Sequence, residues 1–329
     1  GTYGPLPKEM EARANEQLDN FAKLLQGRGI RVDRPTLLDF SQEVRTPDWV
    51  QKSMFGCMPP RDLLLTVGNE ILEATMSQRS RWHEYLCYRP LLEQYFKEDP
   101  FFKWESAPKP RLTDETYKKD YWRKWKKKSK EEQEKAIYER DWILTEKEPC
   151  FDAADIGRAG KDLFVYNSSV TNKAGIEWLK RHFSKHRIHT IWFYEKNGFH
   201  IDATFVLLRP GLALSNPKRI PLAPNMLEYF KWNDWEVVKS AKPALDDYPP
   251  LSFCSPWLSM NTLVLDPKTI CVDAQEKDQM AQFDKLGFEV IPVEFADVSP
   301  FGGGLHCATA DVYREGTCED YFPKQVEGF

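Results

Sequence analysis

A unit of two strands, a helix and a further strand recurs along this chain, and this recurrence restricts the fold more than any other feature. Hydrophobic periods near 2 and near 3.6 follow one another in the same order in each copy. The predicted copies are a hairpin over residues 63–74 with a helix over 77–97; strands 204–208 and 212–215, helix 225–232 and strand 235–238; and strands 261–266 and 269–273, helix 275–286 and strand 289–293.

The spacing of these units predicts how they assemble. A recurrence at roughly 50 residues is typical of radial repeats, in which each unit forms one blade and the hairpin ends face a shared centre. Each predicted helix ends in a glycine or polar break before the next strand, as at Gly287, which suits the left-handed position after a helix. We therefore predict an α/β propeller forming one domain over residues 1–329. An α+β sandwich remains the alternative from periodicity alone.

The charge balance argues against binding to nucleic acid. Lys and Arg number 46 and Asp and Glu 50, so the formal net charge is −4 and supplies no overall positive field for a polyanion. A local basic stretch at residues 118–130 carries Trp and Tyr and has the composition of a single-strand binding segment. The acidic residues 131–134 follow directly, which favours a solvated helix with i,i+4 ion pairs instead.

The sequence also argues against a membrane-spanning protein, a disulfide-bonded fold and a metal-binding protein. The longest apolar stretches are far shorter than the roughly 20 residues that span a bilayer. Seven cysteines, an odd number without C-x-x-C spacing, predict free thiols in a reducing, cytoplasmic compartment. No metal-ligand spacing or phosphate-binding glycine motif is found, so we expect neither a metal nor another cofactor. The chain opens abruptly at Gly1, so a targeting segment removed before it would not be seen.

Cys307 is the candidate nucleophile. It follows the glycine run 302–304, which allows close backbone approach by a substrate, and cysteine attacks as a thiolate when its pKa is lowered or a base is near. The alternative is a small buried side chain in a strand that continues through residues 308–312, which is a common fate of free cysteine. The spacing alone does not choose between the two. His306 would point to the opposite side of such a strand, which makes it the weaker candidate base.

Other polar residues offer acid/base and cation-binding groups. His200 and Asp202 share one face of a predicted strand, where they form either a proton-transfer site or an ordinary solvated pair. Asp152 and Asp155 form an i,i+3 acidic pair. Aspartates buried together are costly without a cation, so several in one pocket predict a cationic ligand, and a guanidinium matches carboxylates with a bidentate fork.

Several motifs, in this order, closely resemble those of the arginine:glycine amidinotransferase family. The resemblance covers residues 27–322, and residues 70–76 and 316–322 look most like the branch found in cyanobacterial toxin pathways. The motifs are PRDLLLTVGNE at 60–70, APKP at 107–110, CFDAAD at 150–155, TNKAGIEW at 171–178, FHIDAT at 199–204, LSNP at 214–217, WLSMN at 257–261 and GGGLHCA at 302–308.

The resemblance implies a five-bladed α/β propeller, the pentein fold, with a central active site. Family members carry a strand-bearing segment upstream of Gly1, so the first blade is expected to be incomplete, and residues are expected to be missing before Gly1 or between Gly4 and Pro5. By motif match Cys307 is the nucleophile, His200 the acid/base and Asp152 its supporting carboxylate. Substrate-binding roles fall to Asp62, Asp202, Arg219, Cys254 and Ser255.

One matched position departs from the family. Two serines precede the Pro-Trp pair in family members, whereas this chain has Cys254 and Ser255. Cysteine is a poorer hydrogen-bond donor than serine, so the contact of Cys254 with the carboxylate of arginine is the weaker expectation.

The implied reaction moves the amidino group of L-arginine through an amidino-cysteine to an amine, and glycine is the expected acceptor, giving guanidinoacetate and ornithine. The alternatives are an amidinotransferase that uses another amine acceptor in toxin or specialised-metabolite biosynthesis, and an arginine deiminase that releases citrulline. A non-catalytic arginine-binding protein is the alternative from a different class. Met76, Ser77, Asn197 and Phe199 are expected to shape the acceptor pocket. The resemblance also implies a homodimer, with small molecules as the other partners.

Overall fold

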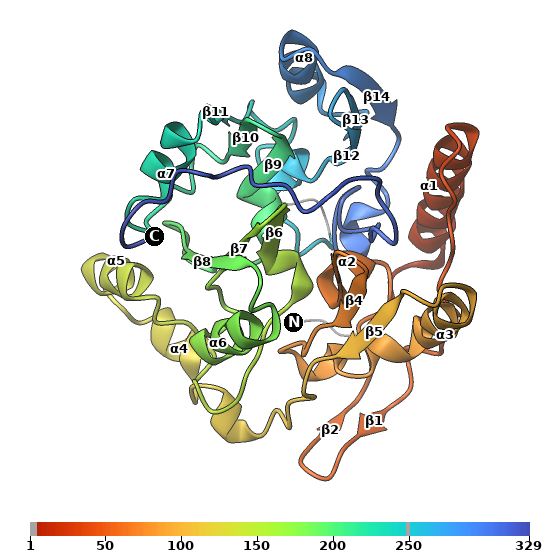
Figure 1. Ribbon diagram of the computed structural model, residues 1–329. Coiled ribbons are helices and arrows are strands. Elements are labelled where there is room, and N and C mark those ends of the chain that lie inside the picture. The colour runs from red at the N-terminus through yellow and green to blue at the C-terminus, as the bar shows by residue number, and fades with distance from the viewer. Residues whose placement is uncertain (1–4, 248–250) are drawn as a thin grey trace.

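The computed structural model describes residues 5–247 and 251–329, and its strands form four three-stranded sheets around a common centre (Figure 1). The four sheets are numbered in chain order. Sheet one contains β3 (Leu64–Val67), β4 (Glu70–Glu73) and β5 (Lys103–Ser106); sheet two β6 (Ile156–Ala159), β7 (Asp162–Tyr166) and β8 (Arg187–Ile191); sheet three β9 (Phe205–Arg209), β10 (Leu212–Ser215) and β11 (Glu236–Lys239); sheet four β12 (Leu263–Asp266), β13 (Thr269–Asp273) and β14 (Glu289–Val293). A separate hairpin pairs β1 (Val44–Arg45) with β2 (Val50–Gln51).

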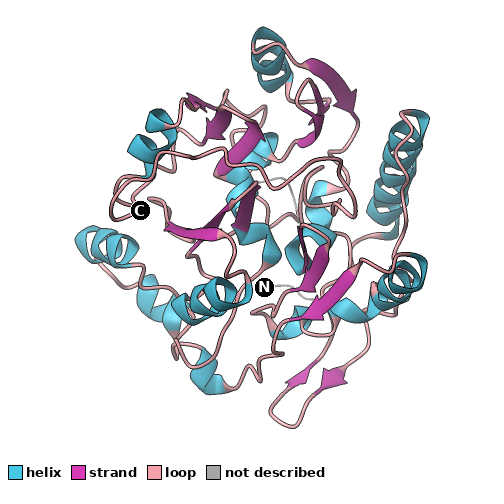
Figure 2. Cartoon of the chain, viewed as in Figure 1, coloured by secondary structure: helices cyan, strands magenta, loops and turns pink. Residues whose placement is uncertain are grey.

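Every sheet repeats one topology. Its first two strands are antiparallel, and the third is parallel to the second. A parallel neighbour requires a crossover, and each crossover contains a helix. These helices are α3 (Arg89–Glu98), α6 (Lys173–His182), α7 (Met226–Trp232) and α8 (Lys277–Lys285), which lie around the outside of the strands (Figure 2). The predicted strand, strand, helix, strand unit is therefore confirmed.

A fifth sector is occupied by α1 (Lys8–Gly27), which lies between sheet four and α3 (Figure 1). Its apolar face, with Phe21 and Leu25, packs on Ile291 and Phe295. The segment after it reaches sheet one, where Asp33 accepts a 2.7 Å hydrogen bond from Tyr95 of α3. Among described residues 5–43 this sector contains no strand. The predicted junction between Gly4 and Pro5 involves residues 1–4, which lie outside the described residues.

Apolar clusters between neighbouring sheets hold the ring together, because each sheet is too small to bury both faces alone. Burying one large apolar side chain contributes about 1.5–3 kcal/mol. Sheets one and two share Leu65, Leu72, Leu163 and Val165; sheets two and three share Phe164, Phe193, Phe205 and Phe230; sheets three and four share Leu208, Leu214, Ile270 and Phe283. The centre of the ring is thereby left to polar loops.

The predicted continuous helix over residues 77–97 is wrong. The segment forms two 3₁₀ turns, Arg79–Arg81 and Glu84–Cys87, and α3 begins only at Arg89. Pro90 lacks a backbone N–H and its ring clashes with the preceding turn, so it is accommodated only at the start of a helix. One complete unit, sheet two with α6, was also absent from the predicted set.

The remaining short helices are α2 (Pro60–Leu63), α4 (Tyr121–Trp125) and α5 (Lys130–Glu139). The last two contain the basic stretch, and a capping box at Ser129 starts α5. Tyr121 and Trp125 are buried against Ile137, so these aromatic rings are not available to stack on bases. Among the described residues the basic side chains Lys118 and Lys128 pair with Asp141, and Arg123 pairs with Asp120, so the i,i+4 pairs expected with residues 131–134 do not form. Every helix in the described part of the chain is too short or too polar to span a bilayer.

The turn between β6 and β7 gives a test of the fold. Gly160 has φ +58°, and a Cβ there would lie 2.0 Å from the carbonyl oxygen of Glu319 in the C-terminal segment. We expect Gly160→Ala to lower the free energy of unfolding by about 2–5 kcal/mol, from the left-handed conformation and the backbone clash together. Gly68→Ala is the control, since Gly68 has φ +60° with open space around it. It should cost only about 1–2 kcal/mol. Equal losses in urea unfolding would contradict the assigned clash.

Candidate active site

Cys307 lies in a tight turn at the centre of the ring, and the alternative of a strand through residues 308–312 is wrong. Ala308 N donates to Gly304 O and Thr309 N to His306 O, so the backbone coils rather than extends. The side chain of Cys307 is 3% exposed. A Cβ on Gly303 would lie 2.6 Å from the Cys307 sulfur, so only glycine lets the turn close over the thiol.

The sulfur has two polar neighbours. Sγ lies 3.3 Å from Asp202 Oδ2, to which the thiol donates, and 3.2 Å from Asn261 Nδ2, which donates to it. Burial, followed by the charges of Asp202 and Asp62, raises the pKa of Cys307 well above its ordinary value. The group is therefore a thiol at neutral pH.

His200 was expected on a strand face, and that prediction is wrong. It has φ +54° and precedes the 3₁₀ turn Ile201–Ala203, a conformation that is rare for residues other than glycine. The turn aims the imidazole at two carboxylates. Nε2 lies 3.0 Å from Asp152 Oδ2, and Nδ1 lies 3.5 Å from Asp62 Oδ1. The Phe199 ring stacks on the imidazole with centroids 3.9 Å apart.

His200 is a buried cation. Burial alone would lower its pKa, but Asp62, Asp152 and Asp155 outweigh burial and raise the pKa to about 10. The imidazole is therefore protonated at neutral pH and is ready to donate a proton. Its aspartates come from α2 and from the 3₁₀ turn Ala153–Asp155 with the residue before it, so the two turns meet at the imidazole.

The three aspartates around His200 are incompletely paired. Asp62 Oδ1, Asp152 Oδ1 and Asp155 Oδ1 are buried with no hydrogen-bond partner among the described residues. Burial raises the pKa of Asp62, and that of Asp155 to about 7. Buried carboxylate oxygens without hydrogen-bond donors are energetically costly. This cluster can therefore accept hydrogen bonds from the N–H groups of a ligand.

Arg81 is a buried residue that sequence reasoning missed, and it forms an ion pair with Asp62. Arg81 Nη1 donates to Asp62 Oδ2 at 2.6 Å, and the rest of its guanidinium forms two 2.8 Å hydrogen bonds to Glu84. Burial raises the pKa of Glu84 to about 6. The pair lies in the turns that replace the predicted helix. With its second oxygen held by Arg81, Asp62 keeps its first oxygen for the site.

Asp202 connects Cys307 to His306. Its Oδ2 lies 2.8 Å from His306 Nδ1 and accepts from the Cys307 thiol. Burial opposes ionisation of Asp202, but the hydrogen bond from His306 and nearby charges outweigh burial and lower the pKa to about 2. The prediction that His306 would point away from the site failed because residues 304–308 form a turn and not a strand.

Arg219 and Ser255 are brought together as predicted, with Arg219 Nη2 donating to Ser255 Oγ at 3.1 Å. Arg219 also contacts Thr204 Oγ1 at 2.8 Å, two residues beyond Asp202. Glu195, which sequence reasoning missed, lies 3.1 Å from Arg219 Nε, and burial raises its pKa to about 7. The neighbouring Cys254 is a thiol, because burial raises its pKa to about 12.

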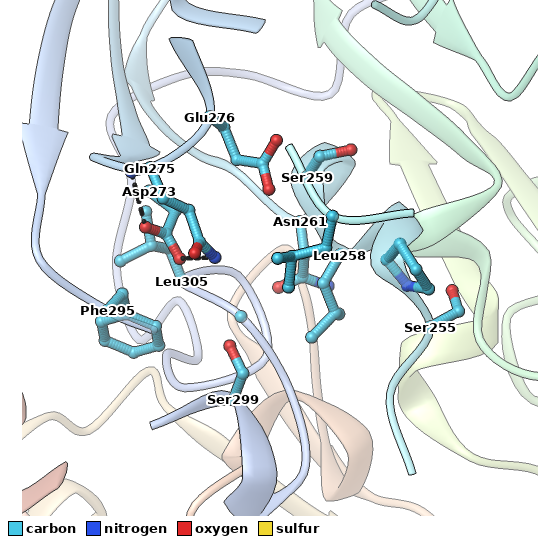
Figure 3. A pocket seen from close by; sticks show the side chains of 13 residues that line it. Ser255, Leu258, Ser259, Asn261, Asp273, Gln275, Glu276, Phe295, Ser299 and Leu305 are labelled. Carbon is cyan, nitrogen blue, oxygen red and sulfur yellow. Dashed lines mark hydrogen bonds between the residues drawn. The ribbon is translucent and has the colours of Figure 1, made fainter. Parts of the chain in front are cut away.

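A small cavity lies beside this cluster, between Asn261 and the turn after β13 (Figure 3). Its volume is about 20 Å³, which is room for one water molecule. Its lining includes Ser255, Asn261, Gly304, Asp273 and Glu276. It is too small for an amino acid, so the buried charges, and not this cavity, locate the candidate site. No group of three or more potential metal-ligating side chains is found within residues 5–247 and 251–329.

The chain is similar to known proteins in both sequence and structure. No family model matches the chain. It is 44% identical over 317 residues to the mitochondrial glycine amidinotransferase of Danio rerio, covering 96% of this chain and 73% of that protein. It is 38% identical over 318 residues to the L-arginine:L-lysine amidinotransferase of Pseudomonas savastanoi pv. phaseolicola, covering 96% and 83%.

Solved structures agree with these sequence relatives. An amidinotransferase of the saxitoxin biosynthetic pathway from Microseira wollei superimposes with a TM-score of 0.86 at 36% identity, covering 97% of this chain and 88% of that one. The inosamine-phosphate amidinotransferase of Streptomyces griseus gives 0.83 at 35%, covering 96% and 84%. A dimethylarginine dimethylaminohydrolase, at 16% identity and a TM-score of 0.57 over 90% of each chain, is similar in fold alone. The predicted propeller fold is confirmed.

Proposed function

The chain belongs to the amidinotransferase family, since it matches family members over nearly its whole length, and we propose that it transfers the amidino group of L-arginine to glycine. One observation carries the site assignment. The charge of Asp62 acts on both the buried thiol of Cys307 and the protonated His200, and the aspartates around that histidine have unpartnered oxygens. A guanidinium supplies the missing N–H donors in a planar fork and places its carbon within this ring of charges.

The donor is proposed to bind through both of its ends. The guanidinium pairs with Asp62 and Asp152, two carboxylates that flank the His200 ring and that each have one oxygen without a hydrogen-bond partner among the described residues. Its α-carboxylate is placed at Arg219 and Ser255, where a guanidinium and a hydroxyl already converge. Holding both ends fixes the guanidinium carbon for attack and lowers the entropy cost of the covalent step.

Cys307 is the proposed nucleophile. The arriving cation offsets the charges of Asp62 and Asp202 that disfavour the thiolate. The S–H proton then passes to Asp202 Oδ2, which already accepts a hydrogen bond from the thiol, and the sulfur attacks the guanidinium carbon. The new S–C bond forms while the bond from that carbon to the side-chain nitrogen of the donor breaks. His200 gives its proton to this nitrogen, and ornithine departs, which leaves an amidino-cysteine.

The second half of the reaction reverses these roles. Neutral His200 takes a proton from the acceptor amine, the amine attacks the amidino carbon, and the C–S bond breaks to release the Cys307 thiolate and guanidinoacetate. Glycine as acceptor is supported by the side chains expected to shape the pocket. Met76 is fully buried and its N–H donates to Phe151 O, next to Asp152. The Phe199 ring covers one face of His200. The stacked Phe199 ring restricts the space beside the histidine.

Product analysis tests the proposal. Separate reactions contain arginine and one acceptor, either glycine, β-alanine, γ-aminobutyrate or lysine, at equal concentrations. In the glycine reaction, mass spectrometry should find ornithine and guanidinoacetate in equal amounts. We expect kcat/KM for glycine to exceed that for each longer amine by about tenfold or more, the discrimination that an extra methylene typically produces. Citrulline without guanidinoacetate would defeat the transferase assignment. Preference for lysine would change the acceptor only.

The cellular setting stays a prediction. All seven cysteines are free thiols in the structure, in keeping with a reducing compartment. A cytoplasmic location and a homodimer follow only from the sequence reasoning and the resemblance. Sedimentation of the purified chain measures the second of these directly.

A further inference from the structure

Asn261 is the polar side chain in closest contact with the Cys307 sulfur. It follows the 3₁₀ turn Pro256–Met260 and is 2% exposed. Its Oδ1 accepts from the backbone N–H of His306 and of Cys307, each at 3.0 Å, and its Nδ2 donates to Cys307 Sγ at 3.2 Å. Figure 3 shows Asn261 among the residues that line the cavity.

The two backbone contacts determine which end of the carboxamide faces the sulfur. Both backbone groups are donors, so they require the carbonyl oxygen of Asn261 and leave its NH₂ group to point at Sγ. The same sulfur donates its own proton to Asp202 Oδ2. Sγ therefore lies between a carboxylate that accepts the S–H proton and an amide that can donate only to sulfur lone pairs.

These two neighbours have opposite effects on the thiolate. The charge of Asp202 opposes a negative sulfur, whereas a hydrogen bond donated to the charged form favours it. The backbone of Gly304 also packs closely against the Asn261 side chain, since a Cβ on Gly304 would lie 2.8 Å from both Cβ and Oδ1 of Asn261. A preorganised donor of this kind costs no rearrangement when charge develops on the reacting atom.

We propose that Asn261 is a catalytic residue, which holds the nucleophile turn closed and donates a hydrogen bond to the Cys307 sulfur whenever that sulfur is a thiolate. It acts when the thiolate forms before attack, and again when the C–S bond of the amidino-cysteine breaks. The inference rests on the proposed function, because it assigns a partner to the nucleophile of that reaction.

The test uses a variant that separates the two roles. Asn261→Asp keeps an oxygen for the two backbone N–H groups but removes the donor to sulfur. Ser259→Ala is the matched control: Ser259 lies in the adjacent 3₁₀ turn, lines the same cavity, is 3% exposed, and its hydroxyl has no hydrogen-bond partner among the described residues. The readouts are circular dichroism, the rate of Cys307 alkylation by iodoacetamide at pH 8, and amidino-adduct formation with arginine by quenched intact-mass analysis.

For Asn261→Asp we expect a folded protein whose Cys307 alkylates about tenfold more slowly and whose adduct forms about 10²–10³-fold more slowly, the range seen when a single donor to a developing anion is removed. Ser259→Ala should match the wild type in both rates. If Asn261→Asp does not fold, Gly304→Ala carries the test, since its methyl group displaces the amide, and the same direction is expected. Wild-type rates in a folded Asn261→Asp would overturn the role of Asn261. Absence of the adduct from the wild-type protein would instead overturn the proposed function.

Discussion

Cys307→Ala is expected to abolish ornithine release from arginine, a loss of at least about 10⁴-fold, while leaving the fold intact. The reaction has no other route to a covalent amidino intermediate, because the S–C bond is the one that holds the amidino group after ornithine leaves. The substitution removes a single sulfur from a turn whose backbone bonds do not involve that atom. Circular dichroism and thermal unfolding should therefore stay close to those of the wild type.

The measurement is ornithine release together with intact mass after quenching during turnover. The wild-type protein should gain the mass of one amidino group, and Cys307→Ala should not. Cys318→Ala serves as the control, since Cys318 is an exposed free thiol in the C-terminal segment. It should retain full activity and the adduct. Undiminished ornithine release by Cys307→Ala would show that the sulfur is not the nucleophile.

His200→Gln is expected to lower kcat by about 10²–10⁴-fold, the usual contribution of a positioned acid and base. Glutamine keeps a donor near Asp152 but can neither give a proton to the leaving amine nor take one from the acceptor. His186→Gln is the control, since His186 lies in the loop after α6 and contacts Cys318 rather than the site. It should leave kcat unchanged. A His200→Gln enzyme with normal kcat and a raised KM would reduce His200 to a binding group.

The same substitution should alter stability in a pH-dependent way. Three aspartates raise the folded-state pKa of His200 to about 10 from an unfolded value near 6.5. A raised folded pKa contributes stability that is fully present below pH 6.5 and is lost as the pH rises through about 10. His200→Gln should therefore be most destabilised at pH 6 and approach the wild type near pH 10, as measured by urea unfolding.

Sequence reasoning succeeded where the signal was local. Three hairpins and the helices α7 and α8 were predicted because alternation and helical periodicity are properties of adjacent residues, as in β9 and β10. Sheet two was missed because β7 is buried at every position and so shows no alternation between buried and exposed residues. The helix over residues 77–97 was overextended because its hydrophobic pattern continues through Pro90, which the backbone cannot follow.

The motifs specified which reactive groups are present, and the resemblance attached a chemistry to them, since residue types and family motifs can be read from a linear chain. Which group touches which was decided by the tertiary structure. Asp202 reaches Cys307 across 105 residues, and Arg81 holds Asp62 while a different carboxylate, Asp152, takes the Nε2 side of His200. Such partnerships depend on where loops from separate sheets end, and on burial that moves the pKa of each group, which no local pattern encodes. The role of Asn261 belongs to the same class, because a turn in one segment and an amide in another form one site only after the ring has closed.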